Sequence, residues 1–412
     1  MNILRKIVAR LLRGADSRGL LQPVRKLAFK RGFAGNPTPT YTHLLVAPPG
    51  GGNIGDQAMI DAFVENTEGA IAIVIAKADA IQVPAEDHGR VSLLLLPNLV
   101  YGNSWSHLRD IHRFGRLASQ SRRVSIVGAD IMDGAYSPGA SVMRSFLAEQ
   151  ASRAGKPSRI LGFSWNGTAT LASTKALKNA SDAGVRLMTR DPLSGKRARA
   201  DGMSNVSEVA DMVFSAKSSS NGAAERILRL AAPGQPVVLL NVSGLIARSL
   251  DQTPDYLAIA RYFLTKGYFV VFLPHVSRPA GDDVKSCRAV WDAVGSSSAV
   301  LVENLLQPAE IRGLTARASF IVTGRMHLAV MGLLNGVPAA TLSTQGKVEG
   351  LMEMFNEPRL CIEPRAGFSA AVISLADQIA SEGSATVGSL QQSARQMALK
   401  SQTNFAWADD NS

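Results

Sequence analysis

Short apolar segments alternate with amphipathic segments along most of the chain. In the first half, this pattern predicts strands at 43–47, 71–75, 92–96, 124–127, 160–163 and 185–189. In the second half, it predicts strands at 237–242, 269–273, 300–302, 320–322 and 337–342. The intervening segments have helical spacing, among them 139–154, 173–182, 254–266, 282–294, 307–316, 328–334 and 349–355. Such alternation is typical of parallel, doubly wound sheets. We therefore predict two Rossmann-like α/β domains facing a cleft, a GT-B-like architecture.

The same pattern suggests where the domains begin and end. A Ser-, Asn- and Gly-rich stretch near residue 218 separates the two alternating halves, and an Asn-Pro-Thr-Pro sequence precedes the first strand. The pattern predicts an extension and linker (1–36), an N-terminal α/β domain (37–215), a linker (216–235), a C-terminal α/β domain (236–365) and a helical tail (366–412). A chain of 412 residues is long enough for two ordinary cores.

The net charge of +11 is concentrated at the N-terminus. Residues 1–32 hold nine Lys and Arg against one Asp, a net charge of +8, which leaves +3 for the rest. This distribution argues against a nucleic-acid-binding face across the main domains. Residues 1–14 also have apolar side chains at helical spacing, but the segment is too short and too interrupted for a transmembrane span or a signal peptide. Two interpretations of residues 1–32 stay open: attachment to an anionic membrane surface, or a solvated tail or helix packed on the body.

Cysteine and histidine are sparse. Cys287 and Cys361 give neither a disulfide framework nor metal-ligand spacing, which favours a reducing compartment. The six histidines are scattered, without clustered carboxylates, so no metal site is predicted.

The stretch 320–355 organises the candidate chemistry. A predicted strand delivers Arg325 and His327 to the start of an apolar helix, and Lys347 follows the next strand. Cations at the carboxyl edge of a parallel sheet, beside a helix N-terminus, suit an anionic ligand. For such a pair alone, an Arg that caps a carbonyl and a His in the core would be the commoner explanation. Lys347 favours the ligand site, because it adds a third cation on the same side.

A glycine-rich turn follows the first strand of the N-terminal half. Gly52 helps to close the turn, Asn53 and Gly55 permit close backbone approach, and Asp56 is predicted to cap a helix from Gln57 onward. The turn matches neither the dinucleotide fingerprint nor the P-loop. Later strand ends of this half carry Asp130 and Asp133, Asn166 and Arg190, and these loops are expected to converge. Asp191-Pro192-Leu193-Ser194 has the pattern of a helix N-terminus.

Taken in order, these stretches resemble the polysaccharide pyruvyl transferase family over roughly residues 43–357. The matching pieces are Gly52-Asn53-Ile54-Gly55-Asp56, Gly128 to Gly134, Arg190-Asp191-Pro192-Leu193-Ser194, Ala210-Asp211, Leu273-Pro274-His275, Gly324-Arg325-Met326-His327, Gly336-Val337-Pro338 and Lys347-Val348-Glu349-Gly350. The family transfers pyruvate from phosphoenolpyruvate to a saccharide, typically as a ketal.

The resemblance implies roles for particular residues. Arg325 and Arg190, with Lys347 in support, would bind the phosphate and carboxylate of phosphoenolpyruvate. His327 would act as general acid/base, since histidine ordinarily titrates near neutral pH. Asp56 or Asp133 would orient or deprotonate an acceptor hydroxyl. The remaining expected substrate-binding residues are Gly52, Asn53 and His275. The N-terminal domain would then serve the acceptor and the C-terminal domain the donor, with phosphoenolpyruvate as co-substrate and neither metal nor cofactor.

Two other functions remain open. One is a GT-B glycosyltransferase that uses a nucleotide sugar, and the other is a non-catalytic, membrane-associated protein of envelope assembly. Under the preferred interpretation the chain serves exopolysaccharide or bacterial cell-envelope synthesis. We expect it in the cytoplasm, peripheral at the inner face of the plasma membrane through residues 1–32. Its expected partners are phosphoenolpyruvate and a saccharide acceptor, which could be lipid-linked, and no nucleic acid.

Overall fold

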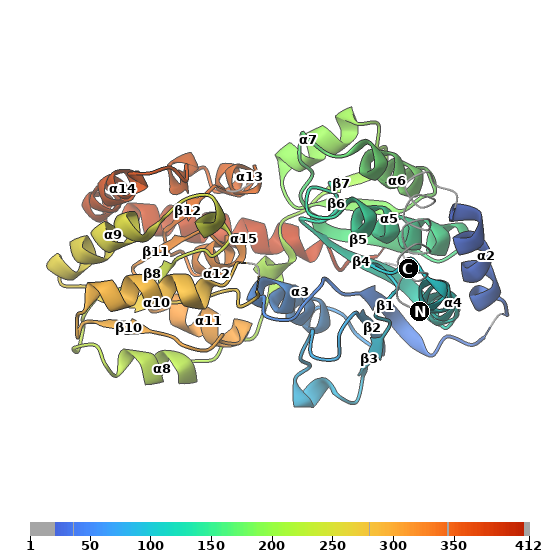
Figure 1. Ribbon diagram of the computed structural model, residues 1–412, viewed down its shortest axis with the longest axis horizontal. Helices are drawn as coiled ribbons and strands as arrows, with labels where there is room; N and C mark the ends of the chain where they lie inside the picture. Colours follow the sequence, from blue (N-terminus) through green and yellow to red (C-terminus); the bar gives the residue numbers. More distant parts are fainter. Residues whose placement is uncertain (1–20, 36, 280, 344–345, 408–412) are drawn as a thin grey trace, which may run out of the picture. The chain divides into compact units, whose positions relative to one another are not determined.

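Two parallel sheets, each with its own helices, account for most of the chain (Figure 1). The computed structural model describes residues 21–35, 37–279, 281–343 and 346–407. The described residues within 1–50 and 67–209 form unit 1, and those within 51–66 and 210–412 form unit 2.

The sheet of unit 1 has seven parallel strands in the order β3-β2-β1-β4-β5-β6-β7. The strands are β1 (Tyr41–Val46), β2 (Ile71–Ile75), β3 (Val91–Leu95), β4 (Ser121–Ala129), β5 (Ser158–Phe163), β6 (Arg186–Thr189) and β7 (Val206–Glu208). From β1 the chain adds β2 and β3 on one side of the sheet, and from β4 it adds β5, β6 and β7 on the other side. The topological switch point of a doubly wound sheet therefore lies between β1 and β4.

Several helices of unit 1 begin at a capping side chain. They are α2 (Gln22–Phe33), α4 (Trp105–Ser119), α5 (Pro138–Arg153), α6 (Leu171–Asp182) and α7 (Pro192–Ala200), with the 3₁₀ turn η1 (Ala85–Asp87). Asp191 caps α7 by accepting a hydrogen bond from the amide of Ser194 (2.7 Å), which confirms the predicted helix start. Ser137 caps α5 in the same way through the amide of Ala140.

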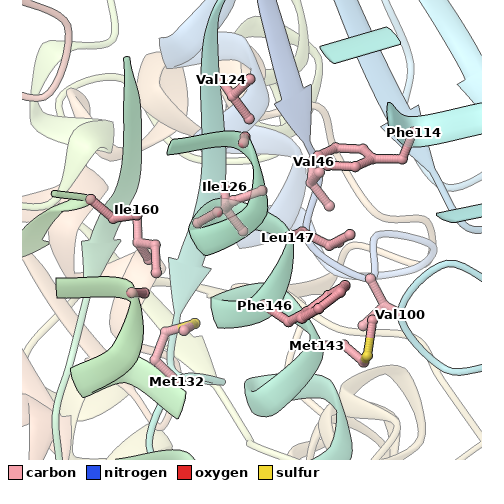
Figure 2. Packing of buried hydrophobic residues seen from close by; sticks show 14 of the residues in the cluster. Val46, Val100, Phe114, Val124, Ile126, Met132, Met143, Phe146, Leu147 and Ile160 are labelled. Atoms are coloured by element: carbon pink, nitrogen blue, oxygen red, sulfur yellow. The ribbon is translucent and has the colours of Figure 1, made fainter. Parts of the chain in front are cut away.

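One continuous apolar core joins the strands and helices of unit 1. Alternate residues of β1, β4 and β5 point to the same face of the sheet, where α4 and α5 cover them. Figure 2 shows this packing, with side chains that include Val46, Val124, Ile126, Ile160, Phe114, Phe146 and Leu147.

The sheet of unit 2 repeats the arrangement with six parallel strands, in the order β10-β9-β8-β11-β12-β13. The strands are β8 (Val237–Asn241), β9 (Phe269–Phe272), β10 (Ala299–Leu301), β11 (Phe320–Thr323), β12 (Ala339–Leu342) and β13 (Cys361–Ile362). Its switch point lies between β8 and β11. The two loops that leave these strands are in close contact, since a Cβ on Gly324 would lie 2.6 Å from that of Ser243.

The helices of unit 2 come from separate parts of the sequence. They are α3 (Ile54–Glu65), α8 (Gly222–Leu228), α9 (Thr253–Thr265), α10 (Asp283–Val294), α11 (Pro308–Thr315), α12 (Met326–Leu334), α13 (Lys347–Met354), α14 (Phe368–Glu382) and α15 (Ser384–Gln402). Three 3₁₀ turns complete the unit: η2 (Met212–Ser215), η3 (Ile246–Arg248) and η4 (Pro358–Leu360). None of the helices in the described ranges combines the length and the apolar character needed to cross a bilayer.

The division into units differs from the predicted boundaries in four places. The described residues of the predicted extension and linker 1–36 belong to unit 1, where α2 packs on α4. Residues 51–66, predicted within the N-terminal domain, belong to unit 2. The carbonyl of Glu65 accepts a hydrogen bond from the Lys217 ammonium (2.8 Å), and this contact helps to hold the end of α3 in that unit. Helix α8 lies inside the predicted linker 216–235, and the predicted tail forms α14 and α15 of the same unit.

Two local predictions were wrong. Helix α3 begins at Ile54 and is capped by Asn53, whose side chain accepts from the amide of Gly55, so Asp56 lies in the first turn instead of capping it. Lys347, predicted in a loop, is the first residue of α13, and the residue before it, Gly346, adopts a positive φ of 72°, which glycine allows. The predicted amphipathic pattern at 1–14 lies outside the described residues.

Candidate functional site

A single buried carboxylate, that of Asp283, joins the carboxyl ends of three strands of unit 2. It accepts hydrogen bonds from the amide of Gly244 after β8 (2.8 Å) and from that of His275 after β9 (3.1 Å). After β11, Arg325 donates to it from Nη2 (2.6 Å) and Nε (3.1 Å). Asp283 is fully buried, so these bonds together compensate its charge.

The guanidinium of Arg325 is therefore held by the protein itself. Its Nη2 also donates to the carbonyl of Gly281 (3.1 Å), and its side chain is 15% exposed. Removing one partner of such a buried pair typically costs about 3–5 kcal/mol. Within the described residues Nη1 has no hydrogen-bond partner, which leaves one edge of the guanidinium for a ligand. The predicted role of Arg325 in donor binding stays a prediction.

His327 occupies the second position of α12, just beyond the end of β11. Its Nε2 lies 3.5 Å from Oδ2 of Asp211, and its side chain is 14% exposed. Its Nδ1 lies against the first turn of α3, where a Cβ on Gly55 would come within 2.2 Å of it. The absence of a side chain at Gly55 thus gives the imidazole its place beside the carboxylate.

Asp211 is itself fixed from several directions. Its Oδ1 accepts from the amide of Val213 (3.0 Å) at the start of η2, and its carbonyl accepts from the hydroxyl of Ser401 (2.9 Å) in α15. The side-chain Nδ2 of Asn404 donates to the preceding carbonyl, that of Ala210 (2.9 Å). The C-terminal helix therefore positions the residue that faces His327. Sequence reasoning did not assign Asp211 to the site, although it noted the Ala210-Asp211 pair.

The glycine-rich segment before α3 packs beside the residues that follow β9. The carbonyl of Gly52 accepts from the amide of Ser277 (2.8 Å), and that of His275 accepts from the amide of Ile54 (3.2 Å). Between them, Asn53 forms an antiparallel bridge with Val276. Gly52 has a φ of 71°, and a Cβ there would lie 2.1 Å from the carbonyl oxygen of Ser277. The glycines thus permit one backbone to approach another, which places Gly52, Asn53 and Asp56 at the edge that carries His327.

Arg278 is a site residue that sequence reasoning missed. Its Nη2 pairs with Oδ2 of Asp56 (3.0 Å), and its Nε donates to the carbonyl of Gly51 (2.8 Å). Asp56 is buried, whereas the Arg278 side chain is 32% exposed. In the sequence, the only feature that could have indicated Arg278 is its position, three residues beyond His275, which itself follows the predicted strand 269–273.

His275 lies in the interior of this site. Burial lowers the pKa of His275 well below its usual value, and the neighbouring His327 and Arg325 side chains lower it further. The imidazole is 1% exposed, and within the described residues neither ring nitrogen has a hydrogen-bond partner. An unsatisfied buried polar group costs about 1–3 kcal/mol, so the two ring nitrogens are candidates for a hydrogen bond to water or to a bound molecule.

The other predicted residues lie elsewhere along the sheets. Lys347 follows β12, the strand beside β11, and is half-buried. Asp133 and Arg190 belong to unit 1, in the loops after β4 and β6. Arg190 is buried and donates from Nε to the hydroxyl of Ser164 (2.8 Å), in the loop after β5. The amide of Ser164 in turn donates to the carbonyl of Ala129, at the end of β4. The three strand ends of unit 1 are thus linked, as expected. The chemical roles predicted for Lys347, Asp133 and Arg190 stay predictions.

Comparison with known protein families identifies the chain. The family model "Polysaccharide pyruvyl transferase" matches residues 53–346, which is most of the sequence. The chain therefore belongs to the polysaccharide pyruvyl transferase family, as the resemblance predicted, and is a transferase by family. Comparison with curated proteins gives no match.

Solved structures share the fold at low sequence identity. The MnaA–UDP structure from S. aureus has 9% identity and a TM-score of 0.57, and the match covers 88% of this chain and 94% of that one. A UDP-GlcNAc 2-epimerase from Neisseria meningitidis, bound to UDP-GlcNAc, has 9% identity and a TM-score of 0.56, with coverage of 88% and 97%. A UDP-glucosyltransferase from Polygonum tinctorium has 11% identity and a TM-score of 0.56, with coverage of 90% and 98%. These likenesses concern the fold alone, and they confirm the predicted pair of Rossmann-like domains of the GT-B type.

The lowered pKa of His275 predicts acid-sensitive stability. The unfolded chain binds a proton at this residue near its ordinary pKa of 6.5, whereas the folded protein does not. The free energy of unfolding should therefore fall as the pH drops from about 7 toward 5, with at most about 1.4 kcal/mol per pH unit from this histidine. In urea denaturation, His275→Asn should have a shallower pH dependence than the wild type. The control His88→Asn, in a loop of unit 1, should keep the wild-type dependence. An unchanged slope in His275→Asn would contradict the assignment.

Proposed function

We propose that the chain transfers pyruvate from phosphoenolpyruvate to a saccharide and forms a pyruvate ketal. Family membership supports pyruvyl transfer in general. The observation that carries the proposal is the arrangement around His327. Its imidazole lies between Gly55 and Asp211, on a sheet edge that also holds the guanidinium groups of Arg325 and Arg278.

The reaction needs a proton donor beside an anionic donor substrate. A proton passes to the methylene carbon of phosphoenolpyruvate, a sugar hydroxyl attacks the central carbon, and the C–O bond to phosphate breaks. A second hydroxyl closes the ketal. The two hydroxyl groups release two protons. One of them makes up for the proton added to the methylene carbon, and the other leaves with phosphate. In the proposal His327 delivers the proton to carbon, and the carboxylate of Asp211, 3.5 Å from Nε2, stabilises the protonated imidazole.

The donor would bind through cations of unit 2. A phosphate and a carboxylate both suit guanidinium groups, and Arg325 offers its Nη1 in a fixed orientation. Arg278 and Lys347 would add positive charge at the same edge, and a nitrogen of the neutral His275 would hydrogen-bond to the substrate. Arg190 of unit 1 is retained as a second candidate ligand. Phosphoenolpyruvate is the co-substrate, and the proposal invokes neither a metal nor another cofactor.

The acceptor side rests on fewer observations. Asp133 is buried, and its Oδ1 accepts a hydrogen bond from the amide of Ala135 (2.9 Å), so the carboxylate is held in one orientation. We propose that it orients or deprotonates an acceptor hydroxyl. Asp56 is the weaker candidate, because Arg278 already engages its carboxylate.

The proposed setting is exopolysaccharide or cell-envelope synthesis. A lipid-linked saccharide at the cytoplasmic face of the plasma membrane would be a suitable acceptor, and the nine basic residues within 1–32 would favour an anionic membrane surface there.

The direct test is phosphate release from phosphoenolpyruvate with a panel of nucleotide-linked and lipid-linked saccharides. The wild type should release phosphate only with a suitable acceptor. His327→Gln should lower kcat by about 10²- to 10⁴-fold, the usual contribution of general acid–base catalysis. Asp211→Asn should cause a smaller loss together with an altered pH–rate profile, while His88→Gln, outside the site, should be unaffected.

Three outcomes would contradict the proposal. Full activity in His327→Gln would remove the assigned proton donor. Binding of a nucleotide sugar without binding of phosphoenolpyruvate would favour the glycosyltransferase. Failure to bind either donor would favour the non-catalytic protein of envelope assembly.

A second prediction concerns the space that Gly55 leaves for His327. Gly55→Ala would place a Cβ 2.2 Å from Nδ1 and displace the imidazole from Asp211. We expect a loss of kcat together with a lower thermal unfolding temperature, because the clash extends to Cγ of His327 (2.7 Å) and crowding a packed site costs about 1–3 kcal/mol. Gly222→Ala, in α8, is the matched control, since a Cβ there meets nothing within 4 Å. Wild-type kcat in Gly55→Ala would show that the position of the imidazole is not critical.

A further inference from the structure

Two adjoining helices of unit 1 carry an exposed basic surface, here called the α2–α4 surface. Its exposed cations are Lys26, Lys30 and Arg31 on α2 and Arg109, Arg113 and Arg116 on α4. Its exposed apolar side chains are Val24, Leu27 and Trp105. Figure 1 shows the two helices side by side in unit 1.

The two helices form one rigid layer. A Cβ on Gly32 would lie 1.8 Å from the carbonyl oxygen of His112, and one on Gly115 would lie 2.5 Å from that of Phe29. Arg25, buried beneath, donates to Nε2 of His107 (2.9 Å). The backbones of α2 and α4 therefore meet at their glycines, so the two helices and the cations that they expose are held in a fixed relation.

The two described helices themselves supply almost no negative charge to compensate these cations. Helix α2 has no Asp or Glu, and the single acidic residue of α4, Asp110, is fully buried. Asp110 accepts a hydrogen bond from the amide of Asn98 (2.9 Å), and its other oxygen is 3.9 Å from Nε of Arg109. The two helices thus expose six cations and no acid, so the local electric field attracts anions.

The exposed face of α4 also has a regular order. Trp105, Arg109 and Arg113 recur at intervals of four residues, so they lie along one face, which Arg116 extends. The Trp105 side chain is 86% exposed and the Arg109 side chain 67%. An indole has an apolar body and a polar N–H, and it is favoured where a bilayer meets water.

We propose that the α2–α4 surface docks the protein on an anionic lipid bilayer. This goes beyond the membrane contact proposed for residues 1–32, because it places Trp105 and the arginines of α4 at the bilayer. It does not depend on pyruvyl transfer. The cations contact lipid phosphates, while Trp105, Val24 and Leu27 enter the headgroup region. The exposed apolar side chains favour a bilayer over a nucleic acid, whose backbone offers them no apolar partner.

The experiment is co-sedimentation of the full-length protein with vesicles of phosphatidylcholine alone or mixed with phosphatidylglycerol. The test variant carries Arg109→Gln, Arg113→Gln and Arg116→Gln, which leave residues 1–32 intact. The control variant carries Arg226→Gln, Arg229→Gln and Arg261→Gln, which remove the same charge from exposed positions of unit 2. Circular dichroism and thermal unfolding verify that each variant is folded.

The wild type should bind the anionic vesicles, and its binding should weaken as salt is added. The partition coefficient of the α4 variant should fall on the order of 100-fold, because each of the three removed cations contributes about 1 kcal/mol near the surface. The control variant should bind like the wild type. Trp105→Ala should weaken binding even at a salt concentration that screens the charges. Wild-type partitioning of the folded α4 variant would overturn the proposal. So would binding to duplex DNA that is tighter than binding to the anionic vesicles and is lost in the same variant.

Discussion

The buried pair of Asp283 and Arg325 is the constraint on which the candidate site depends. Three strands end at the same edge of unit 2, and each would leave polar backbone groups without partners there. One carboxylate satisfies amides after two of these strands and pairs with the guanidinium after the third. Because the pair is shielded from water, its geometry is costly to change. The backbone of Arg325 is thereby fixed where α12 begins, and His327 follows two residues later.

The site also depends on parts of the chain that are far apart in sequence. The glycine-rich segment before α3 comes early in the chain, yet it belongs to unit 2 and pairs with the residues after β9. Asp211 stands at the start of unit 2's longer segment, and the C-terminal helix holds it through Ser401. A change at either end of the chain can therefore alter the environment of His327 without touching the imidazole.

Much of the fold could be predicted from the sequence because it follows from local patterns. Apolar runs and helix caps such as Asp191 are local features, and they indicated the strands, several helices and the doubly wound class. The assignment of residues 51–66 to unit 2 could not be predicted, since hydrophobic periodicity does not say which sheet a helix will cover. Arg325 and His327 were found from their place after a strand, but their partners Asp283 and Asp211 lie 42 and 116 residues away. Spacing in sequence carries no information on such contacts.

The central claim is that unit 2 holds the donor at the edge organised by Asp283. Hydrogen–deuterium exchange of the full-length protein, with and without saturating phosphoenolpyruvate, tests it directly. Exchange should slow in peptides covering 51–56, 274–278 and 324–328 together, because the ligand would stabilise all three segments of one site. Slowing confined to unit 1, or no slowing in these three segments at saturation, would contradict it.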